Sequence, residues 1–221
     1  MRNDASINAT ARLSNVAIRS EEPASVVYRY GPRPNTVYLN ITNRCTNRCS
    51  FCVKNTHSGL SGYRLWLDRE PTADEVWTSF LEVVKESDTE VVWCGFGEPT
   101  VRLGIVLSLT RRIKVEYPHM GVRLDTDGLA QFRSKEREVA SELKEAGVDS
   151  VSISLNADNE SKYNELCRPA LPESYQAVLR FARDCKKHFS KIRLTVPSVP
   201  SVDIDRCARI AEELGCEFKV R

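Results

Sequence analysis

Hydrophobic and polar positions along this chain follow two periods, and the period switches repeatedly from residue 37 onwards. The run Val37-Tyr38-Leu39-Asn40-Ile41 is short and mostly apolar, which is typical of a buried strand. Residues 148–155 alternate with a period of two, as strands do. Val76, Phe80 and Val83 instead recur at the spacing of one helix face. The pattern therefore predicts an alternation of strands and helices.

The same pattern, followed to the end of the chain, predicts six strands with five helices between them. The strands are expected at 37–41, 91–94, 122–125, 148–155, 192–196 and 217–220. The helices are expected at 72–84, 102–117, 134–146, 172–189 and 203–214, and a further strand at 26–30 is expected to pair with the first one. Three local signals mark helix ends: a capping box from Thr72 to Glu75, Gly147 as a C-terminal stop, and Asp203 as an N-cap.

Strands joined by helices of this length predict right-handed crossovers and a parallel sheet. Six strands are fewer than the eight of a closed β/α barrel. The predicted fold is therefore α/β, either an open doubly wound sheet or a partial barrel. In both folds the ligand site lies at the carboxyl ends of the strands.

Four polar motifs follow predicted strands and therefore share one rim of the predicted sheet. They lie at 42–52, 95–100, 125–128 and 154–156. Parallel strands bring their carboxyl ends to one edge, so four independent motifs at that edge indicate a functional site.

The composition is that of an ordinary globular protein and argues against several classes. The chain has 221 residues and a mass of 25.0 kDa, with 41% hydrophobic and 28% charged residues. Lys and Arg total 32 against 30 Asp and Glu, and this balance gives no support for nucleic-acid or membrane-surface binding. No run approaches the ~18 consecutive apolar residues of a membrane-spanning segment.

The first residues differ in character from the rest of the chain. Residues 1–24 are polar and contain Arg2, Arg12 and Arg19, which predicts a disordered extension ahead of one domain at 25–221. Organellar transit peptides can share this composition. The expectation for clustered thiols is nevertheless a cytosolic, reducing compartment.

The chain has eight cysteines, and Cys45, Cys49 and Cys52 form a compact C-x3-C-x2-C motif. A disulfide would leave one thiol over and close a very small, strained loop. Zinc in a structural site takes four ligands, and His57 could complete a Cys3His set. An iron–sulfur cube held by three thiolates would instead keep one iron open to a small ligand, which suits catalysis at the rim of a parallel sheet.

The segment Cys45-Thr46-Asn47-Arg48-Cys49-Ser50-Phe51-Cys52, directly after the first strand, resembles the signature of the radical SAM superfamily. The resemblance covers residues 37–221. The strings LNITNRC at 39–45, GFGEPT at 95–100 and LCRP at 166–169 most resemble the TatD-linked radical SAM proteins, a group named for its association with TatD nucleases. This resemblance implies a partial (β/α)6 barrel of parallel strands.

The resemblance also implies the cofactors. A [4Fe–4S] cluster is expected on Cys45, Cys49 and Cys52, with the amino and carboxylate groups of S-adenosylmethionine on the open iron. Reductive cleavage of S-adenosylmethionine would give methionine and a 5′-deoxyadenosyl radical that abstracts a hydrogen atom. The protein would supply orientation and exclude water.

Two strand-end motifs resemble the family's binding positions for S-adenosylmethionine. Gly95, Gly97 and Glu98 resemble the turn that holds the ammonium group, since glycine allows close backbone approach and a carboxylate pairs with an ammonium. Asp125 and Thr126 resemble the strand end that contacts the ribose. The alternatives are a plain strand-to-helix turn at the first motif and an Asp-Gly turn at the second.

Four further cofactor contacts follow from the resemblance. Phe51 is expected beside the adenine, and Ser154 and Asn156 are expected to contact the carboxylate or the ribose. Val196 is expected to line the adenine pocket through its backbone. The alternatives are a core position for Phe51 and a cap of the next helix for the pair at 154–156.

Two positions depart from the family's pattern. Phe96 stands where the family more often has the first of two adjacent glycines, and Asp127 stands where it often has Asn. Asp125 rather than Asp127 is therefore the predicted ribose contact. Arg168 has two interpretations, an anion contact for the substrate or a surface residue at a helix end.

The sequence thus predicts a radical SAM enzyme, with no residue assigned to catalysis itself. Its expected partners are a reductant such as flavodoxin or ferredoxin and an unidentified small-molecule or protein substrate, without nucleic acid or membrane. Three alternatives remain: a glycyl-radical-enzyme activase acting on a protein, a Cys3His zinc-binding module, and a cluster protein that transfers electrons.

Overall fold

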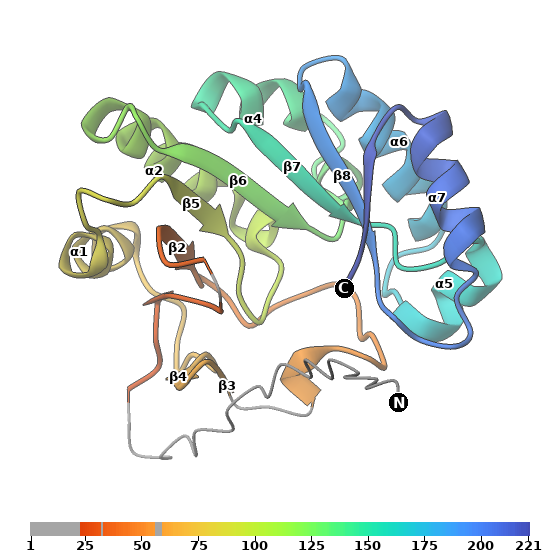
Figure 1. Ribbon diagram of the computed structural model, residues 1–221, viewed down its shortest axis with the longest axis horizontal. Coiled ribbons are helices and arrows are strands. Elements are labelled where there is room, and N and C mark those ends of the chain that lie inside the picture. Colours follow the sequence, from red (N-terminus) through yellow and green to blue (C-terminus); the bar gives the residue numbers. More distant parts are fainter. Residues whose placement is uncertain (1–22, 32, 56–58) are drawn as a thin grey trace, which may run out of the picture.

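The computed structural model describes residues 23–31, 33–55 and 59–221 (Figure 1), so most of the predicted extension at 1–24 lies outside the described residues. The strands are β1 (Val27–Tyr28), β2 (Thr36–Leu39), β3 (Gly59–Leu60), β4 (Tyr63–Arg64), β5 (Glu90–Trp93), β6 (Gly121–Thr126), β7 (Ser150–Ser154), β8 (Lys191–Val196) and β9 (Glu217–Val220). The helices are α1 (Ala73–Val83), α2 (Leu103–Glu116), α3 (Ala130–Arg133), α4 (Val139–Ala146), α5 (Glu160–Cys167), α6 (Ser174–Lys186) and α7 (Ile204–Glu213), with 3-10 turns η1 (Val53–Asn55) and η2 (Pro99–Arg102).

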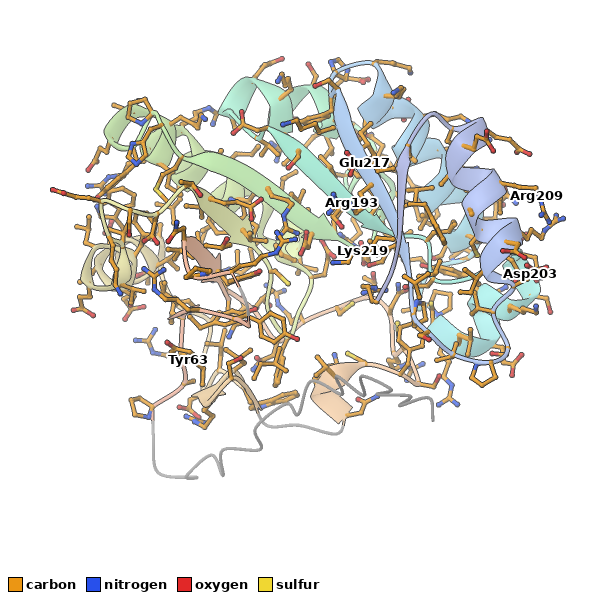
Figure 2. The ribbon with its side chains drawn as sticks, in the orientation of Figure 1. Tyr63, Arg193, Asp203, Arg209, Glu217 and Lys219 are labelled. Atoms are coloured by element: carbon orange, nitrogen blue, oxygen red, sulfur yellow. The ribbon has the colours of Figure 1, made fainter. Side chains whose placement is uncertain are left out.

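A seven-stranded sheet in the order β1-β2-β5-β6-β7-β8-β9 forms the centre of the fold. β1 pairs antiparallel with β2, as predicted, and every other pairing in this sheet is parallel. Arg193 on β8 and Glu217 on β9 form an ion pair at 2.6 Å across the last two strands (Figure 2). Within the described residues β1 and β9 do not pair, so the curved sheet is an open, partial barrel of six parallel strands.

The helices pack along one face of the sheet, and the β3–β4 hairpin lies on the other side (Figure 1). Val91 and Trp93 on β5 join the large hydrophobic core between sheet and helices. Val92, between them, joins a smaller cluster with Tyr28 and Tyr38. This alternation places an aromatic lining on the inner face of the first strands.

The three predicted helix-end signals are confirmed. Thr72 and Glu75 form both hydrogen bonds of a capping box at the start of α1. Gly147 ends α4 with a left-handed φ of 102°, and the Asp203 side chain accepts a hydrogen bond from Arg206 N–H at the start of α7.

The helix predicted at 134–146 is wrong in its first part. Residues 134–138 lie outside any helix, and α4 begins at Val139. The Gln131 side-chain oxygen accepts a hydrogen bond from Val139 N–H at 3.0 Å, and its amide nitrogen donates to the Arg137 carbonyl at 2.5 Å. A side chain from the preceding helix thus satisfies the first donor of α4, which fixes the later start.

The pattern also did not predict α5, whose buried residues are Tyr163 and Cys167. Tyr163, Leu166 and Cys167 do recur at helical spacing, but eight residues are shorter than the window of about 11–18 residues over which that period becomes a clear signal. No helix of the described residues is long and apolar enough to cross a membrane.

Candidate functional site

A cavity of about 580 Å³ opens at the carboxyl ends of the parallel strands. It is lined by every residue predicted for metal or cofactor binding except Val196, namely Cys45, Cys49, Phe51, Cys52, Gly95, Gly97, Glu98, Asp125, Thr126, Ser154 and Asn156. A cavity of the same volume at the amino ends of the strands contains none of these residues. The four sequence motifs therefore meet in one place.

Val196 is the exception. It is buried in β8, and its carbonyl accepts a hydrogen bond from Arg221 N–H at 2.9 Å. Its neighbours Thr195 and Pro197 line the cavity instead. The cofactor contact proposed for Val196 stays a prediction.

The cysteine loop, residues 45–52, follows β2 and is pinned by the end of α5. Arg48 N–H donates to the Cys167 carbonyl, and Ser50 N–H donates to the Leu166 carbonyl, both at 2.8 Å. These two carbonyls belong to the LCRP string at 166–169, which was singled out in the sequence only for its resemblance. Its backbone fixes the path of the loop that carries the three clustered thiols.

The donors of this loop suit a cluster better than a single metal ion. The three thiols are half-buried and line the same cavity. Among the described residues, no three His, Cys, Asp or Glu side chains are placed to hold one ion. A [4Fe–4S] cluster does not need that closeness, because each thiolate binds a different iron of the cube. His57, the fourth ligand in the zinc alternative, lies outside the described residues.

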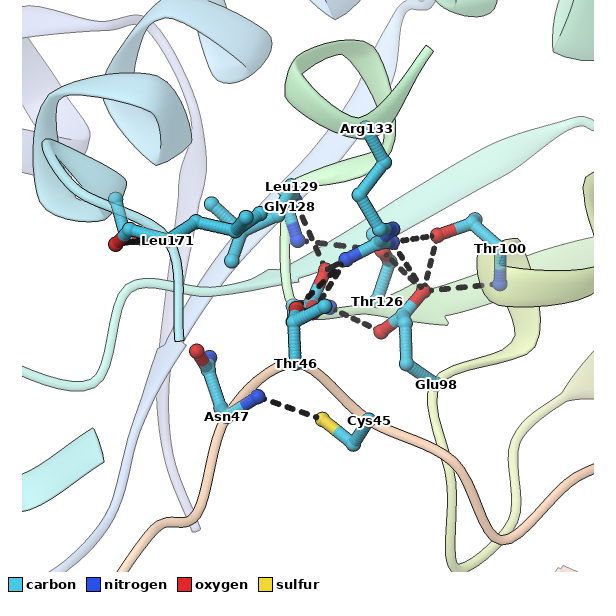
Figure 3. A network of polar contacts seen from close by, with 12 residues as sticks. Cys45, Thr46, Asn47, Glu98, Thr100, Thr126, Gly128, Leu129, Arg133 and Leu171 are labelled. Atoms are coloured by element: carbon cyan, nitrogen blue, oxygen red, sulfur yellow. Dashed lines mark hydrogen bonds and ion pairs between the residues drawn. The ribbon is translucent and has the colours of Figure 1, made fainter. Parts of the chain in front are cut away.

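The surroundings of the loop raise the pKa of two of its thiols, Cys45 and Cys49. Burial, together with nearby Asp127, raises the pKa of Cys45 to about 12. A hydrogen bond with Cys167, together with burial, raises the pKa of Cys49. Asn47 N–H donates to the Cys45 sulfur at 3.4 Å and acts in the opposite sense (Figure 3). Since thiolates are the ligating form, cluster binding is coupled to proton release.

Asn47 also carries an unsatisfied acceptor at the wall of the cavity. Its Oδ1 is buried and has no hydrogen-bond partner among the described residues, whereas its Nδ2 donates to the Tyr163 hydroxyl at 3.1 Å. Phe51, half-buried, packs against the large core and lines the cavity at the same time. A cavity lined by both an orphaned amide oxygen and an aromatic ring fits a polar, aromatic ligand that donates hydrogen bonds.

Gly97 is required where the turn after β5 meets the segment between β2 and the cysteine loop. A Cβ atom at Gly97 would lie 2.3 Å from the Thr42 carbonyl oxygen and 2.6 Å from the Arg44 carbonyl oxygen. A Cβ atom at Gly95 would lie 2.2 Å from Asn40 Oδ1. The close approach that the glycines permit is therefore first of all an approach of the chain to itself.

The Glu98 carboxylate is buried and ties together the ends of β5 and β6 (Figure 3). Its Oε1 accepts from Thr100 N–H at 3.0 Å, from the Thr100 hydroxyl at 2.6 Å and from the Thr126 hydroxyl at 2.8 Å. Its Oε2 accepts from Asp127 N–H at 2.6 Å, the one hydrogen bond to that oxygen within the described residues. Burial and the nearby Asp127 raise the pKa of Glu98 to about 7. Oε2 retains capacity for another donor, such as an ammonium.

Arg133, at the end of α3, joins this network and was not singled out from the sequence. Its Nη1 donates to Asp127 Oδ2 at 2.9 Å and to the Thr46 hydroxyl at 3.0 Å. Its Nη2 donates to the Thr100 hydroxyl (Figure 3). Burial lowers the pKa of Arg133, but Asp127 and Glu98 outweigh it and raise the pKa above the ordinary value.

This ion pair accounts for the departure at Asp127. A carboxylate stands where the family often has Asn because it balances the buried guanidinium of Arg133. The sequence signal was available as the unusual Asp followed, six residues later, by an Arg. What the sequence lacked was the short α3 that turns this Arg back toward the strand ends.

Asp125, the predicted ribose contact, is ion-paired with Arg123 two positions earlier on β6. Arg123 also lies 3.2 Å from Glu90. Burial raises the pKa of Asp125, and Arg123 opposes that effect. The carboxylate therefore lines the cavity in a fixed orientation.

Asn156 has a left-handed φ of 64°, an uncommon conformation for a residue other than glycine. Its Nδ2 donates to Cys167 Sγ at 3.4 Å, and its Oδ1 accepts from Arg221 at 2.5 Å. The next helix, α5, is capped by Asn159, so the alternative of a helix cap for Ser154 and Asn156 is wrong.

Arg168 is exposed and caps the C-terminus of α5, away from the cavity, which favours the helix-end interpretation. Of the cysteines outside the cluster, Cys185 and Cys207 are buried in the core. Cys94 lines the cavity, and burial raises its pKa to about 12.

Comparison with known proteins places this geometry in context. A family model described as the radical SAM superfamily matches residues 39–214. A GTP 3′,8-cyclase of Lactiplantibacillus plantarum is 34% identical over 161 residues, which cover 72% of this chain and 44% of the cyclase. A GTP 3′,8-cyclase of Corynebacterium glutamicum is 28% identical over 201 residues, which cover 88% of this chain and 50% of that protein. The chain thus spans about half the length, or less, of these curated relatives.

Two solved structures share the fold. SuiB of Streptococcus suis, bound to S-adenosylmethionine, has a TM-score of 0.57 at 16% identity, and the matched region covers 83% of this chain and 39% of the SuiB chain. Methylornithine synthase has a TM-score of 0.56 at 14% identity and covers 84% of this chain and 52% of its own. At these identities the likeness concerns the fold alone.

Proposed function

The chain belongs to the radical SAM superfamily, and we propose that it is an enzyme whose Cys45, Cys49 and Cys52 hold a [4Fe–4S] cluster beside S-adenosylmethionine. When bound, these groups supply reductive cleavage of S-adenosylmethionine to methionine and a 5′-deoxyadenosyl radical, for hydrogen abstraction from a substrate still to be identified. The protein's own part is to hold, orient and shield them.

One observation carries the proposal: three clustered thiols line the same cavity as the polar ends of the parallel strands. A site for a cluster alone would need the thiols but not the strand ends. S-Adenosylmethionine presents an ammonium, ribose hydroxyls and an adenine ring. The cavity offers a matching partner for each: carboxylate acceptors at Glu98 and Asp125, and an aromatic ring at Phe51.

The residues divide the work by position. Glu98 Oε2 accepts from the ammonium, because its other oxygen already has three donors. Asp125, oriented by Arg123, accepts from the ribose hydroxyls. Ser154 and Asn156 contact the carboxylate or ribose from the end of β7, and the Val196 backbone remains a further proposed contact.

The relatives suggest a substrate without fixing one. GTP is the substrate in the names of the cyclases, yet the similarity covers half of those proteins or less. It therefore supports the shared cofactor chemistry more directly than it supports GTP. A narrower place among the TatD-linked proteins rests on the strings at 39–45, 95–100 and 166–169 alone.

The partners follow from the chemistry. Reductive cleavage needs an electron donor, and a flavodoxin or ferredoxin is the proposed source. The relatives reported above include no activase of glycyl-radical enzymes, so that alternative gains no support from them. The zinc and electron-transfer alternatives are decided by the following experiment.

Anaerobic reconstitution with iron and sulfide tests the proposal. About four irons and four sulfides per chain are expected, and dithionite reduction with S-adenosylmethionine should release 5′-deoxyadenosine. Cys49→Ala should lose both the iron and the cleavage. Cys216→Ala removes a thiol from the half-buried position after α7 and should keep both.

Two results would contradict the proposal. Uptake of zinc in preference to iron, without cleavage of S-adenosylmethionine, would favour the zinc-binding module. A stable cluster that cycles between oxidation states but never yields 5′-deoxyadenosine would favour electron transfer. Adding GTP to the reduced enzyme then tests the substrate named by the relatives, with loss of GTP as the readout.

A further inference from the structure

Arg133 is the side chain through which three separate segments at the cavity rim are joined. It donates to the Thr46 hydroxyl at 3.0 Å in the cysteine loop and to the Thr100 hydroxyl in the turn after β5. It also donates to Asp127 Oδ2 at 2.9 Å at the end of β6. No strand pairing joins these three segments beyond the strand ends.

The charges around Arg133 make this link a strong one. The side chains of Arg133, Asp127 and Glu98 are 14%, 7% and 4% exposed. Arg133 lies 2.9 Å from one carboxylate and 3.7 Å from the other. Without the guanidinium, two buried carboxylates would stand side by side and repel each other.

The direction of the hydrogen bonds carries the effect of Arg133 to its neighbours. The Thr100 hydroxyl accepts from Arg133, so its own hydrogen points to Glu98 Oε1 at 2.6 Å. The Thr46 hydroxyl likewise accepts from Arg133 and donates to Asp127 Oδ2 at 3.3 Å. Thr46 directly follows Cys45. The same guanidinium therefore fixes a neighbour of the first cysteine, Thr46, and a hydrogen-bond donor to Glu98, Thr100.

We propose that Arg133 is a positioning residue for S-adenosylmethionine, which sets the Glu98 turn relative to the cysteine loop. Arg133 is not among the residues that line the cavity, so it acts through Thr46, Thr100 and Asp127. The inference rests on the proposed function of Glu98 as the ammonium acceptor. It adds that the affinity for S-adenosylmethionine depends on a residue that never touches it.

Arg133→Gln and Arg133→Lys in the reconstituted enzyme test this inference. The readout is the Kd for S-adenosylmethionine, measured anaerobically by calorimetry on the oxidised, unreactive enzyme, alongside iron content. Arg133→Gln should keep its iron and weaken binding about tenfold or more, on the scale of one charge-assisted hydrogen bond. The Kd of Arg133→Lys should lie between those of the wild type and Arg133→Gln. A single ammonium keeps the positive charge but cannot donate to Asp127, Thr46 and Thr100 together as the planar guanidinium does.

Two further variants keep the test decisive. Arg137→Gln is the matched control, because Arg137 lies on the same segment and pairs with Glu142 at the surface. It should bind S-adenosylmethionine as the wild type does. If Arg133→Gln fails to fold, the double variant Arg133→Gln with Asp127→Asn removes the buried guanidinium together with its paired carboxylate, so that Glu98 no longer faces a second buried carboxylate; this variant should fold while still binding weakly.

The outcomes separate this inference from the proposed function. A wild-type chain that takes up no cluster or no S-adenosylmethionine would sink the proposed function itself. A functional wild type with unchanged Kd in the folded Arg133 variants would overturn the inference alone. Folded variants that lose their iron would also overturn it, since Arg133 would then be needed for cluster binding itself rather than for the position of the Glu98 turn. In the reduced state, wild type should change its EPR signal on adding S-adenosylmethionine at concentrations that leave the Arg133→Gln signal unchanged.

Discussion

The cysteine loop is held on two sides, and the two sides use different chemistry. Toward β5 and β6 the contacts are charged, through the guanidinium of Arg133 and the carboxylate of Asp127. Toward α5 they are neutral. There Ala170 N–H donates to the Thr46 carbonyl at 2.8 Å, the loop backbone donates to residues 166 and 167, and Asn47 bonds the Tyr163 hydroxyl.

The two sides differ in how many independent contacts share the stabilising free energy. On the neutral side several bonds of modest strength act in parallel, so the loss of one leaves the others in place. On the charged side a few buried groups depend on each other, and the loss of one leaves its partner as an uncompensated charge. We therefore expect the charged side to be fragile toward single substitutions and the neutral side to be tolerant.

Asp127→Ala should produce the largest effect. It leaves the Arg133 guanidinium buried with Glu98, 3.7 Å away, as its remaining carboxylate. Removing one partner of a buried ion pair costs about 3–5 kcal/mol of unfolding free energy. Asp127→Asn keeps the shape and an acceptor, so it should cost less. Urea unfolding, followed by circular dichroism, measures both.

The control for this prediction is an exposed ion pair. Glu116 pairs with Arg112 at 2.8 Å on the surface of α2, with both side chains more than 40% exposed. Glu116→Ala should change the unfolding free energy by less than about 1 kcal/mol. If Asp127→Ala costs no more than Glu116→Ala, the charged side is not the fragile one and the comparison fails.

Tyr163→Phe tests the neutral side and should have a smaller effect. It removes the hydroxyl that accepts from Asn47 Nδ2. The other side-chain polar atom of Asn47, Oδ1, is already buried without a partner among the described residues. A buried donor left unsatisfied costs about 1–3 kcal/mol. Because the backbone bonds to the α5 end remain, iron content and the Kd for S-adenosylmethionine should stay within about twofold of wild type.

Tyr117→Phe is the matched control for the loss of a hydroxyl. Tyr117 packs its ring against Trp77 and Phe80. Tyr117→Phe should lower the unfolding free energy by less than Tyr163→Phe does. A drop in affinity for S-adenosylmethionine after Tyr163→Phe would show that the neutral side also positions the cofactor, against the division drawn above.

The same contrast explains what could be predicted from the sequence. The strand–helix alternation, the capping box and the C-x3-C-x2-C spacing are local, and each depends on neighbouring residues. The structure confirms the alternation, and it gathers all but one of the predicted site residues around one cavity.

What the sequence could not provide were contacts between distant segments. The role of Arg133 depends on Thr46, 87 residues earlier, and on Thr100, 33 residues earlier. The reason for Gly97 is likewise the Thr42 and Arg44 carbonyls of another segment. A single sequence records the residue types at such contacts but not which residues meet.

Arg168→Gly should have the smallest effect and a stabilising one. Arg168 ends α5 with φ 45° and ψ 58°, a left-handed conformation that costs a residue with a Cβ atom about 1–2 kcal/mol. Glycine avoids this cost but gives the unfolded chain more entropy, worth roughly 0.5–1 kcal/mol. The difference should raise the unfolding free energy by about 0.5 kcal/mol, while Arg168→Ala, which keeps the Cβ atom, should bring no gain.

Cleavage of S-adenosylmethionine should not change, because the side chain lies outside the cavity. A stabilised variant with lost turnover of an identified substrate would restore the anion-contact interpretation of Arg168. A destabilised variant would show that the neutral side relies on this side chain, and not only on the backbone conformation that presents residues 166 and 167 to the loop.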